Sequence, residues 1–262
     1  MRFSGKVAIV TGSTSGIGQA TVLLLAAEGA KVVIHGRSAE KIEATLKMLK
    51  DKGVKSENVM VMRGEIQEDN LVEYLVERTV QKFGRIDILV NNAGLGGAPK
   101  MDPSSMQTYD LLQDVNVKSV IKLTNLVLPY LEKTKGNIVN VSSVLAYYPA
   151  PTLLYYAMSK AALDHFMRSS TETFAKKGVR INNINPGYIR TDFLNQMDVP
   201  KEVQQHLAST YNTIHPFGRV GVPSDVAKPI AFLASDDASY VNGVTLTVDG
   251  GQVLKTNLTH LN

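Results

Sequence analysis

Apolar residues in this chain come in short continuous runs, and the longer segments between them place apolar residues at a helical period. Short continuous runs are typical of strands that are buried on both faces of a parallel sheet. A period of about 3.6 residues predicts helices with one buried face. The runs predict strands at Val7–Val10, Val32–His35, Val59–Met62, Ile86–Val90, Asn137–Val141, Val179–Ile184 and Val244–Val248.

The intervening segments predict helices that alternate with these strands. Such alternation is typical of an α/β fold, here a Rossmann-type doubly wound sheet of about seven parallel strands with helices on both faces. No repeat, low-complexity run or linker divides the chain, so residues 1–262 are expected to form a single domain. The predicted helices are Gly16–Glu28, Ala39–Lys52, Asn70–Phe83, Ser104–Leu131, Leu154–Lys177 and Ser224–Ala234.

The segment 187–222 interrupts the alternation and carries one predicted short helix, Lys201–Thr210. It follows the sixth strand, and open α/β sheets bind ligands at the carboxyl ends of their strands. We therefore expect a substrate lid over 187–222, and the alternative is an inert surface excursion.

Composition excludes several classes of function. The formal net charge is +4 without a block of Lys or Arg, which suits a small anionic ligand and gives no nucleic-acid signal. Cysteine is absent, which excludes disulfides and thiolate chemistry and is consistent with a cytoplasmic location. The five histidines lack the spacing of metal ligands, and no apolar stretch is long enough to span a membrane. We expect neither a metal site nor a membrane partner.

A glycine-rich turn follows the first predicted strand. Gly12, Gly16 and Gly18 stand in the segment Thr11–Gly18, directly before a predicted helix. Glycine permits close backbone approach to a ligand, and a helix N-terminus favours phosphate oxygens. The turn predicts a dinucleotide cradle, although its G-x-x-x-G-x-G spacing departs from G-x-G-x-x-G. The alternative is a glycine-rich turn without a ligand.

The end of the second strand bears on the choice of cofactor. An acidic residue there would bind the ribose 2′-hydroxyl of NAD(H) and repel a 2′-phosphate. The sequence instead places Arg37 and Ser38 after this strand, and a guanidinium is a good phosphate partner. NADP(H) is therefore favoured over NAD(H), while the alternative for Arg37 is an ordinary surface residue.

Tyr156 and Lys160 are four residues apart in a predicted helix, so their side chains share one face. A nearby cation favours the phenolate and lowers the pKa of a tyrosine from its usual value of about 10. A tyrosine of this kind exchanges protons with a carbonyl or alcohol oxygen. The pair alone is also common by chance on solvated helices.

Taken together, these residues make the chain resemble the short-chain dehydrogenase/reductase family over nearly its whole length. Seven segments match the family pattern in the correct order, which makes the resemblance highly specific. They are the TGxxxGxG turn at Thr11–Gly18, NNAG at Asn91–Gly94, the helix asparagine Asn116, the serines Ser142-Ser143, the pair Tyr156 and Lys160, the PG-x-x-x-T segment Pro186–Thr191, and the closing strand and turn Val248–Gly251.

The resemblance implies roles for four catalytic residues. Tyr156 is implied as the general acid in reduction and the base in oxidation. Lys160 is implied to lower the pKa of Tyr156 and to bind the nicotinamide ribose. Ser143 is implied to hold the substrate oxygen, and Asn116 to anchor a water that relays protons from Lys160.

Two neighbouring residues compete for these roles. Only Tyr156 has the four-residue offset to Lys160, because adjacent helical residues such as Tyr155 point about 100° away. Ser143 is preferred over Ser142 because it stands at the family's usual interval of thirteen residues before the tyrosine. Ser142 is expected to form loop hydrogen bonds.

Two positions depart from the family pattern. Glu65-Ile66 stands where many members carry Asp-Val facing the adenine, and Ser15 stands where NADP-preferring members often carry a basic residue. The predicted cofactor-binding residues are Gly12, Ser13, Ser15, Gly16, Ile17, Gly18, Arg37, Ser38, Glu65, Ile66, Asn91, Ala93, Gly94, Tyr156, Lys160, Pro186, Gly187, Ile189 and Thr191.

The substrate pocket is expected to be mostly apolar and aromatic. Its predicted lining comes from Leu145, Tyr147, Tyr148 and Pro149, from segment 187–222 and from loop 95–100. Such a lining favours a neutral or partly apolar carbonyl or secondary alcohol. Tyr147 and Tyr148 are equally compatible with ordinary packing.

The leading hypothesis is an NADP(H)-dependent carbonyl reductase or alcohol dehydrogenase. A 3-oxoacyl-[acyl-carrier-protein] reductase is the nearest alternative, although the basic residues that would dock an acidic carrier are dispersed, as at Arg168, Lys176 and Lys177. A non-catalytic NADP(H)-sensing protein is the alternative from a different class. The resemblance further implies a homo-oligomer, a tetramer or dimer, paired through the helices at Ser104–Leu131 and Leu154–Lys177.

Overall fold

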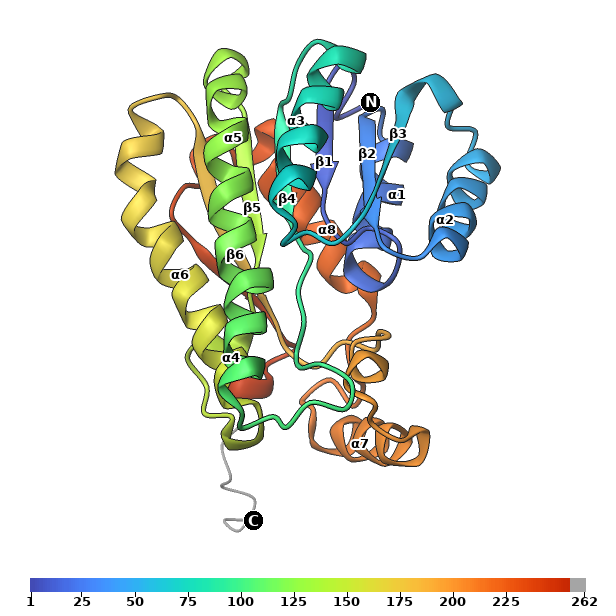
Figure 1. Ribbon diagram of the computed structural model, residues 1–262, viewed down its shortest axis with the longest axis vertical. Helices are drawn as coiled ribbons and strands as arrows, with labels where there is room; N and C mark the ends of the chain where they lie inside the picture. Colours follow the sequence, from blue (N-terminus) through green and yellow to red (C-terminus); the bar gives the residue numbers. More distant parts are fainter. Residues whose placement is uncertain (255–262) are drawn as a thin grey trace.

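The computed structural model describes residues 1–254 and contains a seven-stranded parallel sheet with helices on both faces (Figure 1). The strand order is β3-β2-β1-β4-β5-β6-β7. The predicted fold class is confirmed, and residues 255–262 of the expected domain lie outside the described range. The strands are β1 (Val7–Val10), β2 (Lys31–Gly36), β3 (Val59–Arg63), β4 (Ile88–Asn91), β5 (Asn137–Val141), β6 (Arg180–Pro186) and β7 (Thr245–Val248).

The helices form two layers. Apolar residues of α1, α2 and α8 pack on one face of the sheet, and those of α3, α5 and α6 pack on the other. The chain winds outward from β1 to β3 and then returns to β4 beside β1, so the strand order reverses between β1 and β4. The helices are α1 (Gly16–Ala27), α2 (Ala39–Asp51), α3 (Asp69–Phe83), α4 (Met106–Gln113), α5 (Ser119–Thr134), α6 (Leu154–Ala175), α7 (Lys201–Ile214) and α8 (Pro223–Ala234).

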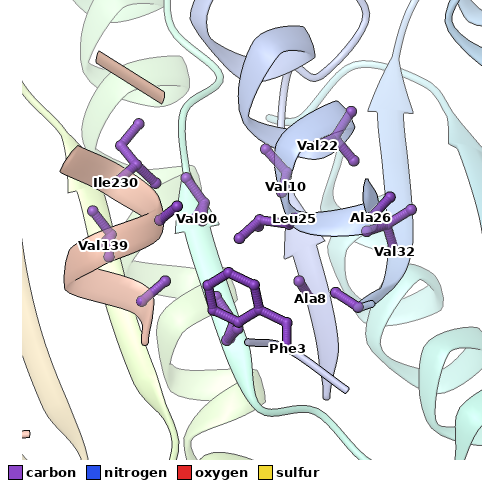
Figure 2. Close-up of a cluster of buried hydrophobic side chains, with 14 of the residues drawn as sticks. Phe3, Ala8, Val10, Val22, Leu25, Ala26, Val32, Val90, Val139 and Ile230 are labelled. Atoms are coloured by element: carbon purple, nitrogen blue, oxygen red, sulfur yellow. The ribbon is translucent and has the colours of Figure 1, made fainter. Parts of the chain in front are cut away.

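The core on the α1 and α8 face explains why the strands are continuously apolar. Figure 2 shows Leu25 of α1 and Ile230 of α8 on the same face of the sheet as Val10 and Val90, and these side chains are fully buried. Burying an aliphatic side chain of this size stabilises the fold by about 1.5–3 kcal/mol. Because the other face is equally buried, β1 and most of β4 are apolar on both sides, and the buried asparagines of β4, β5 and β6 are the polar exceptions.

The long helix predicted at Ser104–Leu131 is divided in the structure. A π-helical turn at Asp114–Lys118 separates α4 from α5, which continues to Thr134. A π turn inserts one residue without ending the helix, and no Gly or Pro marks it in the sequence. Apolar periodicity therefore predicts one continuous helix here.

The segment 187–222 lies at the carboxyl end of the sheet and contains a 3₁₀ turn at Leu194–Met197 and α7. Helix α7 continues past its predicted end at Thr210 to Ile214. In Figure 1 it lies at the bottom of the view, outside both helical layers. The predicted insertion thus stands beside the edge where ligands of open α/β sheets bind.

None of the helices within residues 1–254 combines the length and the apolar character that crossing a membrane requires.

Candidate active site

A cleft of about 560 Å³ opens at the carboxyl end of the sheet. Its walls come from the segments that follow all seven strands, including segment 187–222 after β6, and from α6. The lining includes both the glycine-rich turn and the pair Tyr156 and Lys160. Two sites predicted from separate motifs therefore form a single cleft, located where the strand order reverses.

The glycine-rich turn is held in place by the neighbouring strands. The Gly12 N–H donates to Nδ1 of His35 (3.1 Å), and burial lowers the pKa of His35 to about 4, which keeps the ring a neutral acceptor. The Asn92 side chain donates to the carbonyls of Thr11 and Gly12 (both 2.9 Å). A Cβ atom at Gly18 would collide with Asn92, so glycine is required for this close packing.

Helix α1 begins at this turn with its N-terminus at the cleft. Ser15, Gly16 and Ile17 line the cleft, the Ser15 side chain makes no capping hydrogen bond, and the first turn contains no acidic residue. The first N–H groups of a helix lack intrahelical partners and carry partial positive charge. This end of the cleft can therefore hold an anionic group such as a phosphate.

The opposite wall of this end carries positive charge. Arg37 and Ser38 line the cleft, and so does Lys41 one turn into α2. Arg37 is half exposed and lies 3.6 Å from the carboxylate of Glu65. The Ser38 hydroxyl caps α2 by accepting from the Lys41 N–H (3.2 Å). A second anionic group of a ligand would meet Arg37 and Lys41 here.

Tyr156 and Lys160 lie on one face of α6 and are both buried. The Lys160 Nζ is 5.6 Å from the centre of the Tyr156 ring and donates to the carbonyl of Val141 (2.9 Å). Burial raises the pKa of Tyr156 to about 12 and lowers the pKa of Lys160 to about 8. The sequence predicts a lowered pKa for Tyr156, and the direction is opposite because burial disfavours the phenolate more strongly than its neighbours stabilise it.

Ser143 faces the tyrosine, whereas Ser142 does not. The Ser143 side chain lowers the pKa of Tyr156 and so partly offsets the effect of burial. The Ser142 hydroxyl instead donates to the backbone carbonyl of Lys160 (3.2 Å). Tyr155 points elsewhere and donates to the carbonyl of Ser104 (3.0 Å). The two preferred residues, Ser143 and Tyr156, are thus the ones brought together.

Asn116 lies in the π-helical turn, behind the cleft lining. Its amide pairs with both backbone groups of Leu95 (2.8 Å each) and donates to the Ser159 hydroxyl (2.9 Å). A Cβ atom added at Gly94 would lie 3.2 Å from the Asn116 Oδ1 and 3.4 Å from the Lys160 Nζ. Gly94 therefore lies between Asn116 and Lys160, and because it has no side chain the space between these two residues stays open.

The segment 187–222 contacts both ends of the cleft. Asp192 forms an ion pair with Lys41 (2.7 Å), and Thr191 lies against Gly16. The Phe193 ring is 5.4 Å from that of Tyr156, with the planes tilted by 58°. The segment therefore contacts the cleft both at Gly16 and Lys41 and at Tyr156.

The structure does not bring all of the predicted residues to the cleft. Ser13, Gly18, Glu65, Asn91 and Asn116 lie outside its lining: Ser13 and Gly18 belong to the turn, Asn91 and Asn116 are buried, and Glu65 is a partly exposed partner of Arg37. The predicted residues that do line it are Gly12, Ser15, Gly16, Ile17, Arg37, Ser38, Ile66, Ala93, Gly94, Ser143, Tyr156, Lys160, Pro186, Gly187, Ile189 and Thr191.

The predicted substrate lining is only partly reproduced. Leu145 lines the cleft, but Tyr147, Tyr148 and Pro149 do not. Tyr147 is about half exposed, and its hydroxyl pairs with Thr247 (2.9 Å). The 3₁₀ turn at Val144–Ala146 directs the chain away from the cleft. The two consecutive tyrosines that follow it give no indication of this turn in the sequence.

Sequence reasoning missed two groups of the cleft. Asn92 orients the glycine-rich turn. Its position in the NNAG segment, next to the predicted residue Asn91, is the sequence feature that could have identified it. Lys41 joins Arg37 at the cleft. Its position three residues after Ser38, in the first turn of α2, is the sequence feature that could have identified it. Among residues 1–254, no cluster of three or more His, Asp or Glu side chains is arranged to hold a metal ion.

Comparisons with known proteins agree with this geometry. A family model described as enoyl-(acyl carrier protein) reductase matches residues 12–252. The chain is 37% identical over 255 residues to the 3-oxoacyl-[acyl-carrier-protein] reductase of Thermotoga maritima, covering 97% of this chain and 100% of that protein. A short-chain dehydrogenase/reductase of unknown function from Caenorhabditis elegans, solved with cofactor, has a TM-score of 0.95 at 36% identity and covers 100% of both chains.

A third similar protein is 7α-hydroxysteroid dehydrogenase, solved in complex with NADH and 7-oxo glycochenodeoxycholic acid. Its TM-score is 0.86 at 34% identity, and the match covers 98% of this chain and 97% of that one. The fold, the cleft and these similarities agree, and the chain belongs to the short-chain dehydrogenase/reductase family of oxidoreductases.

Proposed function

We propose that this protein transfers a hydride between NADP(H) and a carbonyl or secondary alcohol, with Tyr156 as the general acid and base. The observation that carries the proposal is that Ser143, Tyr156 and the buried Lys160 line one cleft, with the Lys160 amine 5.6 Å from the centre of the Tyr156 ring. Proton donors held in a buried site are preorganised for a substrate oxygen on which charge develops.

The residues at the other end of the cleft fit a dinucleotide. Gly12 and Gly16 line the cleft, and Gly12 and Gly18 let the turn pack closely on Asn92 and Ala93, since a Cβ atom at either would strike them. The N-terminus of α1 would hold the pyrophosphate, and Thr191 and Ile189 would contact the nicotinamide end. When bound, the nicotinamide supplies or accepts the hydride.

The preference for NADP(H) rests on charge at the end of β2. No acidic side chain follows this strand directly, and both Arg37 and Lys41 line the cleft there. A 2′-phosphate would exchange the 3.6 Å contact between Arg37 and Glu65 for a charge-assisted hydrogen bond. Glu65 and Asp192 are the acidic groups that oppose this preference.

In reduction, the chain's own residues handle the proton. Ser143 donates a hydrogen bond to the substrate oxygen, and Tyr156, whose pKa is raised by burial, holds its proton until that oxygen becomes basic. The Lys160 ammonium then stabilises the phenolate. A water held by Asn116 would return a proton through the gap at Gly94.

The substrate is proposed to be a neutral or partly apolar carbonyl compound or secondary alcohol. The apolar lining of the cleft includes Leu145, Leu153, Leu207 and Phe193, which packs against Tyr156, and apart from Lys160 the charged lining side chains are Arg37, Lys41 and Asp192. An apolar lining with a few convergent polar groups favours a ligand of this kind.

A 3-oxoacyl-[acyl-carrier-protein] reductase is the second candidate, because the relative from Thermotoga maritima carries that name. Its carrier protein would need basic residues beside the cleft. Lys176 follows Tyr156 by twenty residues on α6, which places it about 30 Å further along the helix. Lys176 and Lys177 are also paired, with Glu172 and Glu132.

Turnover of a panel of carbonyl compounds and alcohols, followed by NADPH and NADH absorbance, tests the proposal. The panel holds aliphatic aldehydes, cyclohexanone, acetophenone, the matching alcohols, and acetoacetyl thioesters of coenzyme A and of acyl carrier protein. We expect NADPH-dependent reduction of a neutral ketone or aldehyde. Activity confined to the carrier-bound thioester favours the second candidate, and NADPH binding without any turnover contradicts catalysis and favours a sensor.

We further propose that the protein is a homo-oligomer that pairs through α4, α5 and α6. Light scattering of the purified chain tests this, with a dimer or tetramer expected and a monomer contradicting it.

A further inference from the structure

A buried carboxylate lies one helical turn beyond Lys160. Tyr156, Lys160 and Asp164 follow one another at intervals of four residues on α6 and therefore share one face of the helix. Asp164 is 4% exposed, and Lys160 is equally buried. A buried charge is costly unless it is paired and hydrogen-bonded, so the contacts of Asp164 need an explanation.

Both oxygens of Asp164 accept hydrogen bonds from asparagines of β6. The Asn183 amide donates to Oδ1 (2.8 Å), and the Asn185 amide donates to Oδ2 (2.9 Å). These asparagines alternate along the strand, so both point to the α6 face of the sheet. The carboxylate is thus held between a strand and the helix that carries Tyr156.

The contacts of Asn183 extend across the sheet as a ladder of asparagines. Asn140 of β5 donates to the Asn183 side chain, and Asn91 of β4 donates to Asn140 (2.9 Å each). The ladder ends at the Thr124 hydroxyl on α5 (3.2 Å). Each asparagine amide in it donates one bond toward Asp164, an order that a negative charge at that end favours, and the Asn91 amide also donates to Thr124.

Asn185 links the same carboxylate to the catalytic serine. Its amide donates to the backbone carbonyl of Ser143 (2.8 Å) as well as to Asp164. The Ser143 carbonyl and the Asp164 carboxylate are both acceptors, so the Asn185 side chain must direct its NH₂ group toward them. The Asn185 Oδ1 has no partner among the described residues. The two donated bonds thus tie the Asp164 carboxylate to the backbone of Ser143.

We propose that Asp164 is a positioning residue of the active site, whose carboxylate neutralises the buried Lys160 ammonium and fixes, through Asn185, the backbone that presents Ser143. The catalytic consequence rests on the proposed function. Attraction to Asp164 raises the pKa of Lys160 and partly offsets the larger lowering by burial. Among the described residues, Tyr156 and Asp164 are the titratable groups one turn before and one turn after Lys160 on α6, and the other groups printed near its Nζ are the Val141 carbonyl, Gly94 and Asn116.

The first test needs no substrate and measures the free energy of unfolding against pH. Asp164→Asn keeps the shape, removes the negative charge near the buried Lys160 ammonium, and replaces one acceptor oxygen by an amide donor, a loss that does not depend on pH. We expect its loss of stability to be largest at about pH 6.5 and to shrink by about pH 9.5, as Lys160 releases its proton. Thr124→Val is the matched control, because it removes a hydrogen bond at the far end of the ladder, and its loss should be independent of pH.

The second test is the pH dependence of kcat for the panel ketone that turns over fastest. Asp164→Asn should move the alkaline limb to lower pH by roughly one pH unit, with the Michaelis constant for NADPH little changed. Asp164→Glu keeps the charge and should leave the limb in place. Asn185→Ser keeps the carboxylate but releases Ser143, so it should lower kcat without moving the limb.

These outcomes separate the inference from the proposed function. A stability loss in Asp164→Asn that does not vary with pH, or an unmoved limb, overturns the role of the charge. If Asp164→Asn does not fold at any pH, Asn185→Ser decides the positioning role, and an unaltered kcat there overturns it. Absence of turnover in the unaltered protein defeats the proposed function alone, because the unfolding test still stands.

Discussion

The two ends of the cleft hold their charges in opposite ways. At the Arg37 end, the Arg37 and Lys41 side chains are 52% and 48% exposed and pair with carboxylates across the cleft wall. At the Tyr156 end, Tyr156 and Lys160 are only 8% and 4% exposed, and burial shifts the pKa of each.

This difference sets what each end can do. Exposed charges are screened by salt and individually contribute about 0–1 kcal/mol to stability, so they can select a ligand with little effect on the fold. Buried groups depend on one another, and removing one changes the protonation of the rest. We therefore expect substitutions at the Arg37 end to change affinity and those at the Tyr156 end to change rate.

Apart from substitution of Tyr156, the largest effect on kcat is expected from Ser143→Ala. Loss of a donor to the developing charge should lower kcat by about 10²–10³-fold and leave NADPH affinity unchanged. Ser142→Ala is the matched control, since Ser142 bonds only the Lys160 backbone, and it should keep most activity. Steady-state kinetics of both variants measure this, and equal losses would contradict the assignment.

The pH dependence of reduction should come from the buried end. The pKa of Lys160 is lowered to about 8 by burial, so the amine loses its proton above this pH and no longer stabilises a phenolate. We expect kcat to fall up to about tenfold per pH unit above that value. A profile flat to pH 10, measured where unfolding is excluded, speaks against a catalytic ammonium.

A smaller effect, confined to affinity, is expected from Arg37→Ala. Loss of a hydrogen bond between charged partners should raise the Michaelis constant for NADPH by about tenfold, with that for NADH and kcat nearly unchanged. Lys47→Ala, an exposed lysine on α2, is the control for net charge. Equal increases for both cofactors would mean that Arg37 does not read the phosphate.

The smallest effect is expected at the ion pair of Lys41 and Asp192. Asp192→Asn removes an acid that competes with phosphate for Lys41, so the Michaelis constant for NADPH should fall, by at most about fivefold. Lys41→Met should raise it. Competition of this kind weakens as salt is added, which titration with sodium chloride measures. Changes in the same direction for both variants would contradict it.

The sequence predicts local features more fully than contacts between distant segments. The apolar runs of the strands and the four-residue interval of Tyr156 and Lys160 are both local, and both lie close to where the pattern places them. The ion pair of Lys41 and Asp192 joins residues 151 positions apart and depends on how segment 187–222 folds back. The role of Asp164 depends on the register of β6 against α6, which helical spacing alone does not reveal.

The contrast between the two ends is tested most directly by the substitution Tyr156→Phe. The control is Tyr155→Phe, because the Tyr155 hydroxyl donates to the Ser104 carbonyl. The measurement is kcat for ketone reduction beside the NADPH dissociation constant from fluorescence titration. We predict that Tyr156→Phe loses turnover by at least about 10²-fold while binding NADPH normally, and that Tyr155→Phe retains both. Near-normal turnover in Tyr156→Phe would contradict the proposal that this tyrosine moves the proton.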